Sequence, residues 1–143
     1  MTLSDAKNFL YILNYENYTE SGIEALLQDI GNTNYDLVVM DAFYADNKQF
    51  SKEQIESLKT KKNGGKRLVI SYMSIGEAED YRWYWHEEWK KTATRPLWLE
   101  KENPDWAGNY KVKYWDPERK KIIYSGDDSY LKKILDAGFD GVY

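Results

Sequence analysis

The stretch Asp36-Leu37-Val38-Val39-Met40-Asp41-Ala42-Phe43 decides the fold class. Its centre is continuously apolar, which is typical of a β-strand buried on both faces of a parallel sheet. Shorter apolar runs lie on either side of it along the chain, at residues 9–13 and 67–73. We therefore predict that these three segments are strands of one sheet.

Helical patterns separate the three predicted strands. After the first strand, Ile23, Leu26, Leu27 and Ile30 recur at the spacing of one helix face. Gly31 follows this pattern directly and is predicted to cap the helix at its C-terminal end. This segment therefore has the amphipathic character of a helix that covers a sheet.

A second helix is predicted between the second and third strands. Ser51 and Gln54 form a capping box, in which each side chain satisfies a backbone N–H of the other residue. Ile55 and Leu58 give this helix its apolar side. The basic residues Lys59, Lys61 and Lys62 are expected in its last turn, where cations complement the helix dipole, before Gly64-Gly65 ends it. A binding patch is the less favoured interpretation of these lysines.

The rest of the chain is predicted to continue the alternation. Tyr81, Trp85 and Trp89 have the spacing of one helix face, and residues 103–105 indicate a turn. Residues 110–115 are predicted as a fourth strand. Asp127 or Asp128 is expected to cap a helix that ends at Gly138, and residues 139–143 are expected to begin a fifth strand.

Alternating strands and helices imply right-handed parallel crossovers. Two α/β architectures satisfy this pattern, an open doubly wound sheet and a (β/α)8 barrel. Neither a G-x-G-x-x-G motif nor a phosphate-binding loop follows the first strand, so a nucleotide-binding version is not supported.

Composition narrows the function classes. The chain has 143 residues, of which 42% are hydrophobic and 31% are charged, as in a soluble globular protein. Its net charge of −4 gives no reason to expect a nucleic-acid partner, and no apolar run is long enough for a membrane span. The first residues also lack the apolar core of a signal peptide. Without cysteine and with His86 as the single histidine, no metal or other cofactor is expected.

Candidate functional residues follow the predicted strands. In either architecture, ligands bind beyond the carboxyl ends of the strands. Asp41 ends the second strand, Glu77 follows the third and Asp116 follows the fourth. These carboxylates, together with an aromatic content of 16%, suit glycoside chemistry, which needs a carboxylic acid and a carboxylate. The structural alternative is that Asp41 and Glu77 cap the elements that follow them and Asp116 starts a turn.

Longer motifs resemble a known family. The segment 72–82, which reads Tyr-Met-Ser-Ile-Gly-Glu-Ala-Glu-Asp-Tyr-Arg, is similar to the third-strand signature of family 114-type glycoside hydrolases, relatives of endo-α-1,4-polygalactosaminidase. Segments 103–106, 114–117 and 137–143 also resemble this family. The resemblance implies a TIM-type barrel that acts on a galactosamine-containing polysaccharide or oligosaccharide, in an extracellular or periplasmic location.

The resemblance also indicates which site residues to expect. It implies substrate-binding roles for Asp41, Tyr72, Ser74, Glu77 and Asp116. In the family pattern, an aspartate just beyond the position of Tyr143 and a later glutamate are the leading catalytic candidates. The catalytic residues of this chain are therefore unknown, and we expect it to be inactive alone.

We expect residues 1–143 to form a single, incomplete barrel domain. About five strands are predicted, whereas a barrel of this type needs roughly 250 residues. Open edges at the first and fifth strands would favour self-association. The rival is a self-contained fold, such as a small open α/β sheet, that needs no further strands. A non-catalytic carbohydrate-binding module and a fragment that completes a barrel with another chain are the rival functions.

Overall fold

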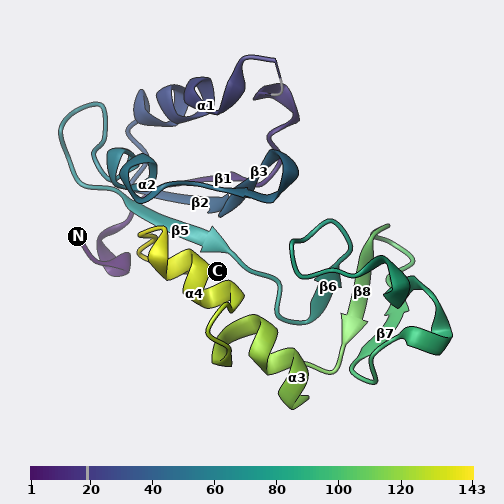
Figure 1. The fold of residues 1–143 in the computed structure, drawn as a ribbon. Helices are drawn as coiled ribbons and strands as arrows, with labels where there is room; N and C mark the ends of the chain where they lie inside the picture. Colours follow the sequence, from purple (N-terminus) through teal and green to yellow (C-terminus); the bar gives the residue numbers. More distant parts are fainter. Residues whose placement is uncertain (19) are drawn as a thin grey trace. The chain divides into compact units, whose positions relative to one another are not determined.

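The structure, a computed structural model, describes residues 1–18 and 20–143 (Figure 1). These residues form two compact units. The first contains Met1–Met73 and Lys133–Tyr143, and the second contains Ser74–Lys132. No helix in the described part of the chain is long and apolar enough to cross a membrane.

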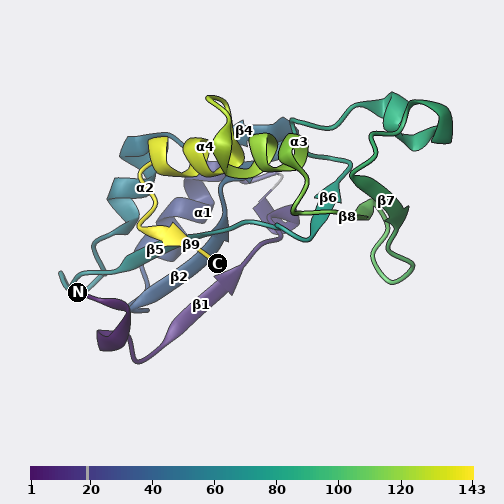
Figure 2. The same cartoon turned by 90° about the horizontal axis from the view of Figure 1, so that it is seen from below.

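The first unit is built on a parallel sheet of four strands, in the order β1-β2-β5-β9 (Figure 2). The strands are β1 (Phe9–Ile12), β2 (Leu37–Asp41), β5 (Leu68–Tyr72) and β9 (Gly141–Val142), and every neighbouring pair is parallel. The expected α/β class and parallel β/α units are thus confirmed, and the sheet is not closed into a barrel. The short strands β3 (Phe43–Tyr44) and β4 (Lys48–Gln49) form a separate antiparallel pair.

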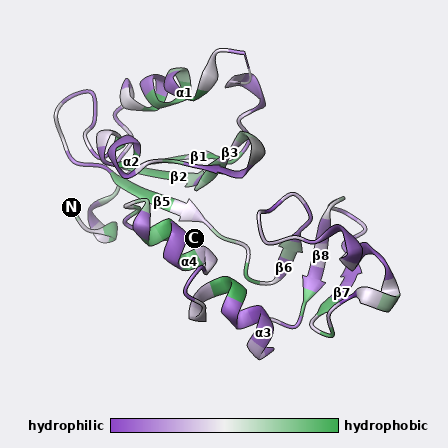
Figure 3. Ribbon diagram, in the orientation of Figure 1, coloured by the Kyte–Doolittle hydropathy of each residue, from purple (hydrophilic) through white to green (hydrophobic). Residues whose placement is uncertain are grey.

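The two faces of this sheet differ in burial. Val38, Met40 and Val69 have no exposed surface, and the sheet strands carry much of the hydrophobic sequence (Figure 3). The opposite face begins with Phe9 and Tyr11, which are 64% and 48% exposed. Successive residues of a strand point to opposite faces. Val39 pairs with Tyr11 and is only 5% exposed, so this second face is exposed at the edge strand β1 and buried at β2.

The predicted helices of the first unit are present as α1 (Gly22–Gly31) and α2 (Lys52–Leu58). Leu26, Ile30 and Ile55 are buried, in agreement with the predicted apolar faces. α1 includes Gly31 as its last residue, and the capping position is Asn32, whose N–H donates to the Gln28 carbonyl.

The capping box at the start of α2 is confirmed, but the predicted place of the lysines is wrong. Ser51 Oγ accepts from Gln54 N, and the Gln54 side chain accepts from Ser51 N. α2 ends at Leu58, so the lysines follow the helix. Lys59 Nζ lies 2.9 Å from Asp140 and Lys61 Nζ lies 2.7 Å from Asp36, so both instead act as ion-pair partners.

The second unit contains a three-stranded antiparallel sheet in the order β6-β8-β7. Its strands are β6 (Glu77–Glu79), β7 (Leu99–Glu102) and β8 (Asn109–Val112). The prediction that residues 110–115 form a parallel barrel strand is therefore wrong. Tyr110 and Val112 are buried whereas Lys111 is exposed, and this alternation is typical of an antiparallel strand with one solvated face.

The expected helix through Tyr81, Trp85 and Trp89 is also absent. Turns and the 3-10 helices Glu87–Lys90 and Thr92–Thr94 occupy this segment. The rings instead pack on one another, with centroids 5.4 Å apart for Trp85 and Trp89 and 4.8 Å apart for Trp85 and Tyr110. Ring packing across short turns replaces the packing of a helix face.

Three further helical elements precede β9. They are α3 (Pro117–Lys120), a π-helix (Lys121–Ser125) and α4 (Tyr130–Asp136). Gly138, with φ of 87°, follows α4 as expected for a glycine that ends a helix. At the other end Ser129 Oγ accepts from Lys132 N, so Ser129 provides the bond expected from Asp127 or Asp128. Short 3-10 helices at Leu3–Asp5, Glu16–Tyr18 and Ala45–Asn47 complete the elements of the described residues.

Candidate functional site

Asp41 and Tyr72 lie together at the carboxyl edge of the parallel sheet. They are the last residues of β2 and β5 and are directly paired in the register of these strands. Paired residues of neighbouring strands point to the same face, so both side chains project from one face. This is the edge at which parallel α/β folds bind their ligands.

The position of Asp41 is fixed by the loops that follow the strands. Asp41 is only 8% exposed, and its Oδ1 accepts a hydrogen bond of 3.0 Å from Phe43 N. The Tyr15 hydroxyl donates to the Asp41 carbonyl at 2.8 Å. The expected structural role of Asp41, as a cap for the next loop, is therefore present.

A cavity of about 460 Å³ adjoins this edge in the first unit. Its lining comes from the segments that follow β1 and β2 and from the start of α1, and it includes Tyr15, Glu16, Tyr18, Ile23, Phe43 and Tyr44. These residues were not predicted as a group from the sequence. The signal that the sequence offers is an aromatic segment after each of two neighbouring strands.

The other three predicted site residues lie in the second unit. Ser74 is half-buried in the segment that precedes β6. Glu77 is the first residue of β6, and its Oε1 accepts from Asn103 Nδ2 at 2.7 Å. The Arg119 guanidinium donates to the Glu77 carbonyl at 2.7 Å. Glu77 is therefore a fixed strand residue rather than the expected helix cap.

Asp116 has a clear structural role at the start of α3. Its Oδ1 accepts from Glu118 N at 2.9 Å, and Pro117 occupies the first helical position. A side-chain oxygen in this position satisfies one of the free N–H groups of a helix end. Because β6 and β8 are antiparallel, the expected rim of parallel strands brings together only Asp41 and Tyr72. A common site for all five residues stays a prediction.

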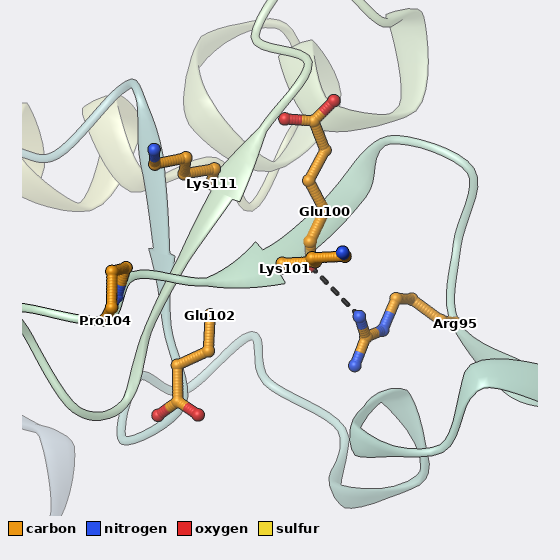
Figure 4. A pocket seen from close by; sticks show the side chains of 6 residues that line it. All are labelled: Arg95, Glu100, Lys101, Glu102, Pro104 and Lys111. Carbon is orange, nitrogen blue, oxygen red and sulfur yellow. Dashed lines mark hydrogen bonds between the residues drawn. The ribbon is translucent and has the colours of Figure 1, made fainter.

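A second cavity, of about 530 Å³, lies on the antiparallel unit (Figure 4). Charged residues dominate its lining, which consists of Arg95, Glu100, Lys101, Glu102, Pro104 and Lys111. The Arg95 guanidinium is held by the carbonyls of Trp89, Lys90 and Glu100. The lining carries charges of both signs, and Arg95 already donates to backbone carbonyls. The cavity therefore indicates no particular class of ligand.

The described residues contain no group of three histidine, aspartate or glutamate side chains placed to hold a metal ion. The side chain of His86 is 60% exposed, 3.8 Å from Glu88 Oε1, and its ring packs on Trp89. Its position on the surface is the one expected from its charged sequence neighbours.

The parallel sheet with its covering helices defines the chain as an α/β protein built from parallel β/α units, and its likeness to a solved structure shows that these units are those of a TIM-type barrel. A crystal structure of Aspergillus fumigatus Ega3 in complex with galactosamine has a similar fold, with a TM-score of 0.59 at 23% sequence identity. The likeness covers 94% of this chain and 42% of that one.

The model of glycoside-hydrolase family GH114 matches residues 4–143, and the chain therefore belongs to this family. The resemblance noted in the sequence is confirmed. An uncharacterized protein of Methanocaldococcus jannaschii is 50% identical over 119 residues, which are 82% of this chain and 32% of that protein. Uncharacterized proteins of Thermotoga maritima and Deinococcus radiodurans are each 37% identical, over 80% and 82% of this chain. The chain spans about a third of the length of these relatives.

Proposed function

We propose that this chain forms part of a glycoside hydrolase that, in the full-length protein, cleaves a galactosamine-containing polysaccharide. Membership of family GH114 supports the reaction class. The pairing of Asp41 with Tyr72 at the carboxyl edge of the sheet carries the proposal, because it sets a carboxylate beside a phenol where barrel enzymes bind substrate. The galactosamine in the Ega3 crystal structure supports an amino-sugar substrate.

The proposed roles of individual residues follow the chemistry of sugars. Carboxylates accept hydrogen bonds from hydroxyl and ammonium groups, and a tyrosine offers both a flat apolar face and a hydroxyl. We assign substrate contacts to Asp41, Tyr72, Ser74, Glu77 and Asp116. Hydrolysis also needs an acid and a second carboxylate on opposite sides of the scissile bond, and we leave that pair unassigned within residues 1–143.

The setting of the reaction forms part of the same proposal. Residues 1–143 would contribute to a single barrel domain, whose sheet continues beyond the free edges of β1 and β9. Those edges carry unpaired backbone groups that can add a strand, so an incomplete chain would self-associate. A polysaccharide substrate favours an extracellular or periplasmic location.

A second candidate function is carbohydrate binding without hydrolysis. The cavity lined by tyrosines after β1 and β2 favours it, because binding sites for small molecules are concave and rich in aromatic side chains. This function would need no catalytic pair.

The release of reducing ends from polymeric α-1,4-linked galactosamine by the full-length protein tests the proposal. Polymeric glucosamine serves as the matched comparison, because it carries the same amine on a different sugar. Release from the galactosamine polymer alone supports the proposal. Binding of the polymer without any release would favour the carbohydrate-binding function, and neither binding nor release would overturn both.

A further inference from the structure

Four aromatic side chains line a cavity at the carboxyl ends of β1 and β2. We call this cavity the tyrosine pocket, defined by Tyr15, Glu16, Tyr18, Phe43 and Tyr44. Tyr15 to Tyr18 follow β1, which ends at Ile12, and Phe43 to Tyr44 follow β2, which ends at Asp41. The pocket therefore lies at the ligand-binding edge of the parallel sheet.

The aromatic walls of the pocket are held in place before any ligand binds. Tyr15 and Tyr44 both pack against the buried ring of Phe50, with centroid distances of 6.0 Å and 4.9 Å. The Tyr15 hydroxyl is bonded to the Asp41 carbonyl. A rigid wall loses little conformational entropy on binding, which favours affinity.

Tyr18 completes the wall from the first loop. Its hydroxyl donates to Asp29 at 3.0 Å. This hydrogen bond raises the pKa of the Tyr18 phenol above its ordinary value. The ring is half-buried, with one part against the protein and another part available to the cavity.

The chemistry of the pocket fits an amino sugar better than a purely apolar molecule. A volume of about 460 Å³ is within the range of small-molecule sites. Tyrosine rings can cover the apolar face of a pyranose, while a nearby carboxylate suits its polar edge. Glu16 is exposed and lines the same cavity, so it adds a negative charge where a ligand's ammonium group can approach.

We propose that the tyrosine pocket is a subsite for one hexosamine ring of the polysaccharide, with Tyr44 against the ring face and Glu16 facing the amine. The proposal rests on the proposed function and extends it, because it adds a binding position outside the five residues assigned above. Longer oligosaccharides would reach this subsite in addition to the edge at Asp41 and Tyr72, so affinity should rise with chain length.

Binding measurements on the full-length protein test the subsite. The probes are α-1,4-galactosamine oligosaccharides of increasing length and their N-acetylated counterparts, titrated by calorimetry. Tyr44→Ala should weaken binding of the long amino oligosaccharides by about tenfold, as loss of a central aromatic contact does, and should leave the shortest ones unchanged. Tyr44→Phe, which keeps the ring, should bind nearly as well as the native protein.

The charge contribution is tested separately. Glu16→Gln should weaken binding of the amino oligosaccharides several-fold, about what one charge-assisted hydrogen bond contributes, and should not affect the N-acetylated ones. Tyr35→Ala and Glu20→Gln are matched controls. Tyr35 is an exposed tyrosine just before β2, at the opposite end of the sheet. Glu20 is an exposed glutamate that follows the pocket residues and does not line the cavity.

The outcomes separate the subsite from the proposed function. One outcome would overturn the subsite and leave the hydrolase intact. In it, the native protein releases reducing ends, and Tyr44→Ala binds the long oligosaccharides as the native protein does, at an unchanged melting temperature. Length-dependent binding that Tyr44→Ala abolishes, without any release by the native protein, would support the subsite and count against the hydrolase. Equal losses in the control variants would also overturn the subsite.

Discussion

Asp41 and Tyr72 stand directly opposite each other at the ends of two adjacent parallel strands. Neighbouring strands lie about 4.8 Å apart, so the two side chains are near neighbours on one face. Asp41 Oδ1 accepts from Phe43 N and the Asp41 carbonyl accepts from the Tyr15 hydroxyl, so both the side chain and the backbone of Asp41 are held in place. The pair thereby links the fold of the first unit to the proposed substrate contacts.

Asp116 can be tested for a substrate role apart from its capping role. Asparagine is as good an N-cap as aspartate but lacks the charge, whereas alanine removes the cap and costs about 1 kcal/mol. Asp116→Ala should therefore lower the free energy of unfolding, and Asp116→Asn should not. A substrate role predicts that Asp116→Asn raises KM for the galactosamine polymer. An unchanged KM would restrict Asp116 to the cap.

The capping box at Ser51 should contribute measurably to stability. Ser51→Ala removes the bond from Gln54 N and should lower the free energy of unfolding by about 1 kcal/mol in urea denaturation. Ser57→Ala is the control in the same helix. Its hydroxyl donates to the Gln54 carbonyl within α2, an interaction that does not favour the helix, so its loss should be close to neutral. Equal effects of the two changes would contradict the capping assignment.

The ion pair between Glu79 and Arg82 should be strongly coupled. Both side chains are 3% exposed, with Arg82 Nε 2.5 Å from Glu79 Oε2, and the Tyr81 hydroxyl also donates to Glu79. Removing one partner leaves the other buried charge without its ion-pair partner, so Glu79→Met or Arg82→Met should each cost about 3 kcal/mol.

The double variant of this pair provides the decisive comparison. Replacing both residues with methionine removes both charges, so its loss of stability should be clearly smaller than the sum of the two single losses. Additive losses, measured as free energies of unfolding, would show that the two side chains act independently.

The lowered pKa of Asp36 should make the folding stability of the protein depend on pH. A hydrogen bond from Lys61, followed by one from the backbone N–H of Lys7, lowers the pKa of Asp36 below its ordinary value of 3.8. A carboxylate with a lowered pKa stabilises the fold above its unfolded value and loses this contribution as pH falls through the folded value. Asp36→Asn should therefore destabilise the protein at pH 7.

The effect of Asp36→Asn should shrink as the pH is taken well below 3.8. Lys61→Met, which removes the main cause of the lowered pKa, should show the same pH dependence. Melting temperatures measured across this range provide the check. A destabilisation that stays constant down to the lowest pH would show that charge at Asp36 is not its source.

The strands of the first unit could be predicted because their signal is local. The apolar centre of β2 and the capping box of α2 each lie within a few residues, and both are found where the sequence places them. The segment 110–115 was predicted as a further parallel strand, whereas its alternation of buried and exposed residues is that of a half-solvated antiparallel strand.

The tyrosine pocket could not be predicted in the same way. Tyr15 and Tyr44 are distant in sequence, and only the pairing of β1 with β2 brings their loops together around Phe50. The spacing of Tyr81, Trp85 and Trp89 wrongly predicted a helix for a related reason. Ring-to-ring packing across turns produces the same periodicity as a helix face, so a spacing of four residues is ambiguous in a segment this rich in tryptophan.

Steady-state hydrolysis of the galactosamine polymer by full-length Asp41→Asn tests the central claim most directly. Asparagine Oδ1 can still accept the bond from Phe43 N, so the loop should keep its structure while the charge is lost. A substrate-binding role predicts that KM rises about tenfold with kcat little changed, as expected when a uniform binding contact is removed. Native KM and kcat in this variant would contradict a substrate site at the edge formed by Asp41 and Tyr72.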